Sequence, residues 1–258
     1  MKLPPSNPSP ARGLTLVELL VVIAILAGLM VAGWGGFRAA RTKAHQSVST
    51  TNLRQLAAAN LLFAADHQTY CPAIDRRNLI RWHGGRSSTK GTFDPQQGFL
   101  AEYLGMSREV GRCPEFERLI SGSSFNELGT GGYGYNGTYI GGTPSDPFRP
   151  NRPANVPNPS RTLMFATTAF AVADGIQEYP TADPPMYVDA NWRPRGPLQP
   201  SVHFRFNGRA LIAWCDGHVS EEEPSDRSTT NLYGGDNREA RIGFCGPVEN
   251  NGWWNPRN

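Results

Sequence analysis

Hydrophobic and polar positions divide the start of the chain into two contrasting segments. Residues 1–13 are polar and proline-rich, whereas no charged side chain occurs from Leu19 to Phe37. At about 1.5 Å per residue, a helix over that uncharged stretch measures about 29 Å, close to the hydrocarbon thickness of a membrane. The pattern predicts a leader of residues 1–13, followed by a helix whose first half, residues 14–37, spans a membrane.

The helix is expected to continue beyond this apolar stretch. Residues 38–66 contain no proline or glycine, and their larger apolar side chains recur at spacings of three and seven positions. That spacing places them on one helical face, where they form a stripe suited to packing on a sheet of the same chain. The helix should end near His67, before Pro72. The stripe consists of Leu53, Leu56, Ala57, Phe63 and Ala64.

Residues 67–258 carry short patterned stretches separated by loops, and we interpret them as a globular head. Residues 98–104 have the apolar spacing of a short helix, and residues 161–166 form an apolar run typical of a strand. Residues 121–160 and 174–200 are rich in glycine, proline and small polar residues, which predicts loops.

Two turn signals in the C-terminal third predict paired strands. Residues 203–206 and 210–215 look like two strands separated by Asn207-Gly208, a dipeptide that favours tight hairpins. Asp216-Gly217 then leads into residues 218–220 as a second turn. We expect a three-stranded antiparallel meander. Together with the long helix, it predicts an α+β fold in which the helix packs on a small antiparallel sheet with loop-rich insertions.

Composition narrows the possible partners. The chain has 258 residues, a formal net charge of +3 and 18% charged residues. This charge is too small to indicate nucleic-acid binding, and no cluster of basic residues is interleaved with aromatics. Nucleic acid is therefore excluded as an expected partner.

Glu18 interrupts the apolar segment and limits its interpretation. A cleaved secretory signal would have a charge-free core and a small-residue cleavage site, but Met30-Val31-Ala32 is a poor site. An ordinary signal anchor explains the length of the segment but not the carboxylate, which costs several kcal/mol in hydrocarbon unless it has a partner. Snorkelling of Glu18 to the interface is the remaining plain explanation.

The ordered run from Gly13 to Ile25, G-L-T-L-V-E-L-L-V-V-I-A-I, resembles the N-terminal signal of type IV pilins and type II secretion pseudopilins. The resemblance implies that a prepilin peptidase cuts after Gly13 and that the new amino group of Leu14 is N-methylated. Leu14 stands where members of the family more often have Phe. The new amino group gives Glu18 an opposite charge to pair with, within one subunit or between neighbours, so the resemblance assigns Glu18 to assembly.

The same resemblance implies a location and a set of partners. Basic residues flank the apolar segment on both sides, so charge alone does not orient it. A pilin-like precursor would cross the inner membrane once, with its leader in the cytoplasm and its head in the periplasm or outside. It would meet the peptidase and methyltransferase and an assembly platform in that membrane, and then self-associate into a filament.

The C-terminal half deepens the resemblance. Residues 205–219 and 242–250 are similar to regions of the large pilin-like proteins of planctomycetes and verrucomicrobia, which carry an H-x9-D-G pattern. The histidine of that pattern would fall at Phe206, and the nearest histidine is His203. The resemblance leaves open the role of this region, the secretion or pilus system, the major or minor status of the subunit, and its cargo.

The four cysteines, Cys71, Cys113, Cys215 and Cys245, are widely spaced and form no C-x-x-C pair. In an exported chain an even number permits two disulfides with three possible pairings, and free buried thiols are the alternative. Zinc binding by Cys71, Cys113, His83 and His218 is disfavoured by their irregular spacing.

Major pseudopilins carry a calcium loop near the C-terminus, so the resemblance makes calcium the one cofactor to consider. Asp226, Asp236, Asn237 and Glu239 surround Gly234-Gly235 in a polar stretch that offers hard oxygen ligands. No D-x-D-x-D-G motif occurs there, and a solvated loop is the alternative.

No sequence pattern indicates catalysis. Cys113, His203 and Asp216 supply the residue types of a thiol enzyme, but nothing in the sequence brings them together. We expect a structural subunit of a pseudopilus or pilus-like filament and not an enzyme. The alternatives are a minor pilin or adhesin that binds a polysaccharide or surface, and a membrane-anchored envelope enzyme. Trp253-Trp254 either docks on the core or contacts a neighbouring subunit.

Overall fold

The computed structural model describes residues 15–121, 128–189, 191, 193–197, 199–226, 231 and 234–258; within these ranges the side chains at positions 31–36, 38, 194, 195, 197 and 226 lie outside the description. The chain divides into two compact units, residues 1–43 and residues 44–258. The first contains the beginning of the long helix, and the second contains the rest of that helix and the strands.

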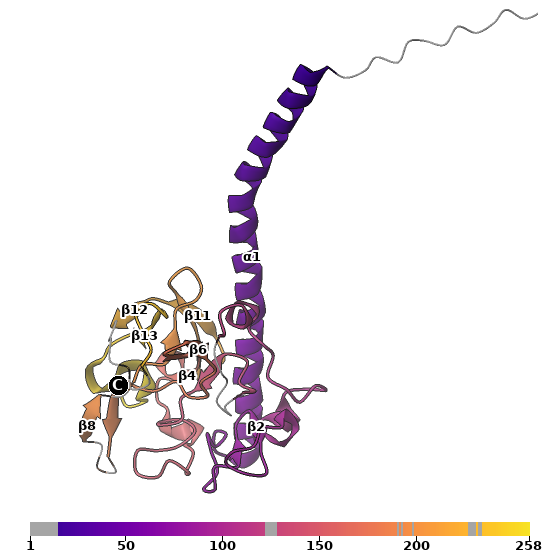
Figure 1. The fold of residues 1–258 in the computed structure, drawn as a ribbon. Coiled ribbons are helices and arrows are strands. Elements are labelled where there is room, and N and C mark those ends of the chain that lie inside the picture. The colour runs from indigo at the N-terminus through magenta and orange to yellow at the C-terminus, as the bar shows by residue number, and fades with distance from the viewer. Residues whose placement is uncertain are drawn as a thin grey trace, which may run out of the picture. The chain divides into compact units, whose positions relative to one another are not determined.

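Helix α1 runs from Leu16 to His67, 52 residues in all (Figure 1). It ends because Gln68 adopts a left-handed conformation with φ 60°, and the Gln68 amide donates to the Ala64 carbonyl at 2.9 Å. The backbone stays helical through the glycines at positions 33, 35 and 36. A single helix through both predicted halves, ending at His67, is confirmed.

The largest sheet of the head has four strands in the order β11-β10-β4-β3, and every neighbouring pair is antiparallel. Every residue of β3, β4 and β10 is buried, so these strands are continuous apolar or small-residue runs with no exposed face. The strands are β3 (Tyr133–Tyr135), β4 (Leu163–Thr167), β10 (Ala210–Trp214) and β11 (Val219–Glu222).

The remaining strands form smaller antiparallel sheets. A three-stranded sheet has the order β12-β13-β9, from β12 (Pro224–Asp226), β13 (Ile242–Cys245) and β9 (Val202–His203). The two-stranded sheets pair β1 (Ile80–Arg81) with β2 (Gly84–Gly85), β5 (Phe170–Val172) with β6 (Gly175–Gln177), and β7 (Met186–Val188) with β8 (Pro194–Pro197).

Short helical turns complete the head. The only described α-helix besides α1 is α2 (Pro114–Glu117), and the 3-10 turns are Pro95–Gln97, Ala101–Tyr103, Pro153–Asn155, Pro159–Arg161 and Glu249–Trp254. The short helix predicted over residues 98–104 is therefore only one 3-10 turn, and the strand predicted over 161–166 begins at Leu163. The predicted loop 121–160 contains β3, whose three residues are too few to give a periodic signal.

The predicted C-terminal meander is confirmed in its second hairpin, where β10 pairs with β11 across Asp216-Gly217, and is wrong in its first, because β9 does not pair with β10. The turn at Asn207-Gly208 is present, with φ of 52° and 83° and a bridge between Phe206 and Arg209. Strand β10 nevertheless pairs with β11 and β4, whereas β9 pairs with β13. The Phe204 amide donates to the Arg241 carbonyl at 2.9 Å, which draws the chain before the turn into the other sheet. Turn chemistry fixes the turn locally, but pairing with a distant strand decides the sheet.

The apolar stripe of α1 is buried as predicted. Leu53, Leu56, Ala57, Phe63 and Ala64 are at most 8% exposed and belong to the main core of the head. Their 3.6-residue periodicity survives because only one face of the helix meets the rest of residues 44–258.

A second apolar cluster includes Trp254 and residues of β4 and β10, and on β10 its residues alternate with those of the main core. Trp254 is fully buried, and its indole Nε1 donates to the Ala182 carbonyl at 2.9 Å. The Trp253 ring packs edge-on against Trp214 at 5.1 Å between centroids. The tryptophan pair docks on the core of its own chain, and the predicted α+β class with small antiparallel sheets is confirmed.

Candidate processing and assembly site

The first turn of α1 is closed by reciprocal hydrogen bonds between Thr15 and Glu18. The Thr15 amide and hydroxyl donate to Glu18 Oε2 at 2.9 and 2.8 Å, and the Glu18 amide donates to Thr15 Oγ1 at 3.2 Å. This arrangement is a capping box, which satisfies helix N–H groups that otherwise lack partners. Gly13 and Leu14, the residues of the predicted cleavage, lie outside the described residues.

Glu18 therefore has a structural role that the sequence interpretation missed. Its carboxylate occupies the first turn, where the helix dipole favours negative charge. The sequence does contain the pattern of a capping box, because Thr15-x-x-Glu18 directly precedes an apolar run. The predicted role in assembly is a separate property of the same carboxylate, and it stays a prediction.

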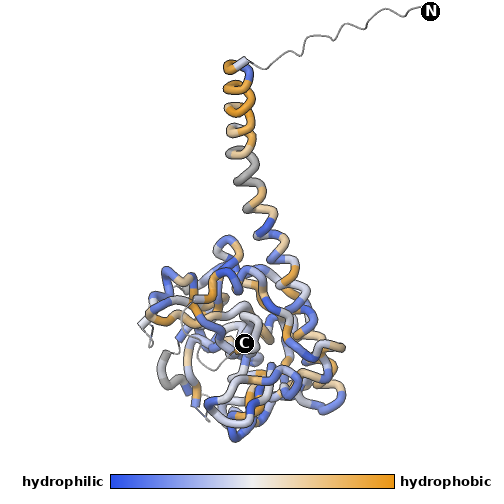
Figure 2. Tube along the Cα trace, turned by 45° about the vertical axis from the view of Figure 1, so that its right-hand side comes forward, coloured by the Kyte–Doolittle hydropathy of each residue, from blue (hydrophilic) through white to orange (hydrophobic). Residues whose placement is uncertain are grey.

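Most residues in the first described turns of α1 are hydrophobic (Figure 2). Leu16 is 80% exposed, Val17 70% and Leu29 64%, and the large apolar side chains between them are also exposed. Within the described residues, no helix combines the length and the apolarity needed to cross a membrane. The description of side chains stops at Met30 and resumes at Phe37, and the membrane span over 14–37 stays a prediction.

In the head, α1 is fixed by two asparagines that reach strand β3. Asn52 Nδ2 donates to the Tyr133 hydroxyl at 3.2 Å, and Asn60 Nδ2 donates to the Tyr135 hydroxyl at 3.0 Å. Asn60 Oδ1 also accepts the Cys71 amide at 2.8 Å, just after the helix ends. Asn60 is fully buried, so these bonds fix the register of α1 against the sheet.

The four cysteines are free, buried thiols, so the possible disulfides are absent from this structure. Cys113 Sγ accepts the Ser49 hydroxyl at 3.0 Å, which adds another polar contact between α1 and the head. Burial raises the pKa of the remaining thiols, Cys71, Cys215 and Cys245, above the ordinary value and keeps them protonated.

The three residue types of a thiol enzyme are not joined by hydrogen bonds. Cys113 is held by Ser49, whereas Asp216 Oδ1 lies 2.6 Å from His218 Nδ1 and accepts the His218 amide at 3.1 Å. Asp216 with Gly217 therefore makes the predicted turn. His203 is 1% exposed, and its Nδ1 has no partner in the described part of the chain.

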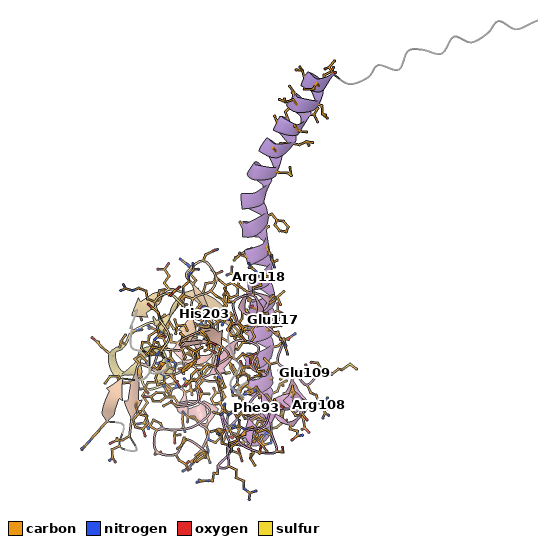
Figure 3. The ribbon with its side chains drawn as sticks, in the orientation of Figure 1. Phe93, Arg108, Glu109, Glu117, Arg118 and His203 are labelled. Atoms are coloured by element: carbon orange, nitrogen blue, oxygen red, sulfur yellow. The ribbon has the colours of Figure 1, made fainter. Side chains whose placement is uncertain are left out.

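The region around His203 and Phe206 is part of the core. His203, which is labelled in Figure 3, and Phe206 are each 1% exposed, so both lie in the interior of the head. Burial and the charges of Arg205 and Arg241 lower the pKa of His203 well below its usual value, so the imidazole is neutral. Arg205 Nη2 donates to the carbonyls of Gly132 and Thr168 at 2.7 and 2.8 Å. The buried arginine joins two loops, a role that the sequence did not reveal.

Asp236 and Asn237, two of the residues considered for calcium, make hydrogen bonds with nearby residues. Asp236 Oδ1 accepts the amides of Arg238 and Glu239 at 2.7 and 3.1 Å. Asn237 is fully buried, and its Oδ1 accepts Asn231 Nδ2 at 2.8 Å. The side chain of Asp226 lies outside the described residues.

Across the described residues, no three His, Cys, Asp or Glu side chains lie close enough together to bind a metal ion. The four residues considered for zinc therefore do not form such a group. His83, for example, is buried with its ring 4.8 Å from that of Phe93. Calcium binding stays untested.

Comparison with known proteins informs the N-terminus. Residues 8–33 match the model of the prokaryotic N-terminal methylation motif. No curated protein and no solved structure matches the chain. The matched residues contain the predicted cleavage position at Gly13, the capping Thr15 and Glu18. The match supports a prepilin-type N-terminus, and with the α+β fold it supports a pilin-like protein.

Proposed function

We propose that this chain is a structural subunit that is cleaved after Gly13 by a prepilin peptidase, N-methylated at Leu14, and assembled into a type II secretion pseudopilus or a type IV pilus-like filament. The observation that carries the proposal is the methylation motif over residues 8–33, which includes the cleavage position and Glu18. The chain is the substrate of this chemistry and performs none itself.

The apolar surface of α1 supports assembly. Exposed Leu, Ile and Val side chains from Leu16 to Leu29 are unfavourable in water, because each loses transfer free energy of about 1.5–3 kcal/mol when it is not buried. Before assembly, the lipid of the inner membrane covers this surface, with residues 14–37 as the anchor and the head in the periplasm or outside. After assembly, the same faces of neighbouring subunits pack in a helical bundle.

Glu18 links processing to assembly. Cleavage after Gly13 would place a new α-amino cation at Leu14, one residue before the capping Thr15. A cation at a helix N-terminus opposes the helix dipole, and a nearby carboxylate offsets it. Glu18 is in the first turn and can pair with that cation in its own subunit or in a neighbour, where low polarity strengthens the attraction.

Processing can be tested by coexpression with a prepilin peptidase. The wild-type chain should be shortened at its N-terminus, whereas Gly13→Val should stay at full length because the bulky side chain obstructs the cleavage position. Gly28→Ala is the matched control, because an added Cβ there meets nothing within 4 Å. Equal shortening of Gly13→Val and wild type would overturn the proposed cleavage.

A further inference from the structure

A cleft of ≈ 360 Å³ opens in the head between residues 73–82, 137–147 and 179–188. Its volume falls in the range of small-ligand sites. Every lining residue belongs to the compact unit of residues 44–258, so the cleft is a feature of the head alone. Prolines and aromatic rings form much of its wall, and threonines supply most of its polar groups.

The base of the cleft is fixed by buried hydrogen bonds. Trp82 is 1% exposed, and its indole Nε1 donates to the Pro180 carbonyl at 2.9 Å. The Tyr179 hydroxyl donates to Asp183 Oδ2 at 2.6 Å, which holds that ring against the wall. A ligand would therefore meet a preformed surface and lose little binding free energy to ordering it.

The rim offers groups that lack partners. Tyr187, on β7, is 52% exposed, and its ring lines the opening. Within the described residues, the hydroxyls of Thr138, Thr181 and Tyr187 have no hydrogen-bond partner, although they border the same cleft. An exposed aromatic ring beside unpaired hydroxyls is suited to a ligand that is apolar on one face and polar at its edges.

The described lining of the cleft carries little charge. Among the described lining residues, Arg81 is the only charged one and none carries a carboxylate. Both Arg81 Nε and Nη2 donate to Asn78 Oδ1, at 3.1 and 3.0 Å, and the guanidinium stacks over Phe93 with its carbon 5.0 Å from the ring centroid. Because this cation already has polar and aromatic partners, the hydroxyls of the cleft dominate recognition.

We propose that this cleft binds a neutral sugar unit of a glycan chain. The C–H face of a pyranose would stack on Tyr187, and its hydroxyls would exchange hydrogen bonds with Thr138 and Thr181. Sugar binding does not rest on the proposed filament function, because it concerns only residues of the head. Cleavage at Gly13 and sugar binding at Tyr187 can each fail while the other holds.

A proline-rich peptide is the competing occupant, since such peptides dock in aromatic grooves. Peptide docking needs several exposed aromatic ridges, whereas among the described lining residues Trp82 is buried and Tyr187 is the one exposed aromatic residue. The unpaired hydroxyls can donate and accept hydrogen bonds, and a sugar ring offers both kinds of partner, whereas a polyproline stretch offers only carbonyl acceptors. The observations therefore favour the sugar.

Calorimetry on the full-length chain tests the proposal, with the protein in a zwitterionic detergent because sugar-headed detergents would compete. The probes are cellohexaose and chitohexaose as neutral chains, and decaproline as the peptide. We expect at least one neutral oligosaccharide to bind. Tyr187→Ala should weaken that binding about tenfold or more, because it removes the stacking surface. Thr181→Val should weaken it about fivefold through one lost hydrogen bond.

Met106→Ala is the matched control, because Met106 is fully exposed and does not line the cleft. It should leave affinity unchanged. Absence of binding by both oligosaccharides would overturn the proposal, as would wild-type affinity in Tyr187→Ala. Binding of decaproline that is lost in Tyr187→Ala, without sugar binding, would assign the cleft to peptides instead.

Discussion

Glu18 Oε2 accepts both the amide and the hydroxyl of Thr15, at 2.9 and 2.8 Å. The carboxylate that would pair with a new amino cation at Leu14 thus already serves as a helix cap. Capping needs an acceptor oxygen, whereas pairing needs a negative charge. The two roles can be separated by a substitution that keeps the oxygen and removes the charge.

Glu18→Gln makes this separation, and Glu18→Ala removes both properties. We expect both variants to enter the membrane but to reduce assembly about tenfold or more, since a lost charge pairing of about 1.4 kcal/mol already gives that factor. The measurement is the fraction of the chain in filaments sheared from cells that express an assembly system. If Glu18→Gln assembled like wild type while Glu18→Ala did not, capping and not charge would be the role of Glu18 in assembly.

Asn60 should be a large contributor to the stability of the head. Asn60→Ala leaves the buried Cys71 amide without its acceptor and removes the bond to Tyr135, which should cost about 2–3 kcal/mol. Urea unfolding of the full-length chain, followed by tryptophan fluorescence, measures the free energy of unfolding. Gln55→Ala, at an exposed position of the same helix, is the control. A loss no greater than that of the control would contradict the assigned role.

Asp183 should make stability depend on pH. Burial raises the pKa of its carboxyl group to about 6 from the ordinary 3.8, and the hydrogen bond from Tyr179 only partly opposes this. The pKa of this group is higher in the folded state than in the unfolded state, so its protonated form stabilises the fold. This contribution is complete below the unfolded pKa and is lost as the pH rises through about 6.

Asp183→Asn keeps an acceptor for Tyr179 and cannot ionise. We expect it to be more stable than wild type above pH 6, by on the order of 2 kcal/mol, and to lose this advantage near pH 4. Thermal unfolding across that range provides the measurement. Asp174→Asn, at an exposed carboxylate, matches the change in net charge. An advantage of Asp183→Asn that did not change with pH would contradict the burial argument.

The sequence predicted the parts of the fold that depend on local pattern. The buried stripe from Leu53 to Ala64 follows from helical periodicity, and the helix end at His67 follows from the chemistry of the next residues. Burial of Asn60 was not predictable, because its partners Cys71 and Tyr135 lie beyond the helix in the sequence. A polar residue on an apolar stripe gives no sign of which distant group it will meet.

The pairing of strand β9 was the other feature that the sequence did not predict. Asn207-Gly208 marks a turn correctly, yet β9 joins β13 and not β10. Long-range pairing depends on which strands reach a free edge, and short strands carry little register information. At the N-terminus, by contrast, the signal is wholly local, and the order from Gly13 to Glu18 could be interpreted from the sequence alone.

The N-terminus of the chain isolated from its native membrane tests the central claim most directly. Mass spectrometry of the N-terminal peptide should find N-methyl-leucine at Leu14 and no trace of residues 1–13. A chain that begins at Met1, or one that begins beyond Ala32 as after signal-peptide cleavage, would contradict the prepilin account.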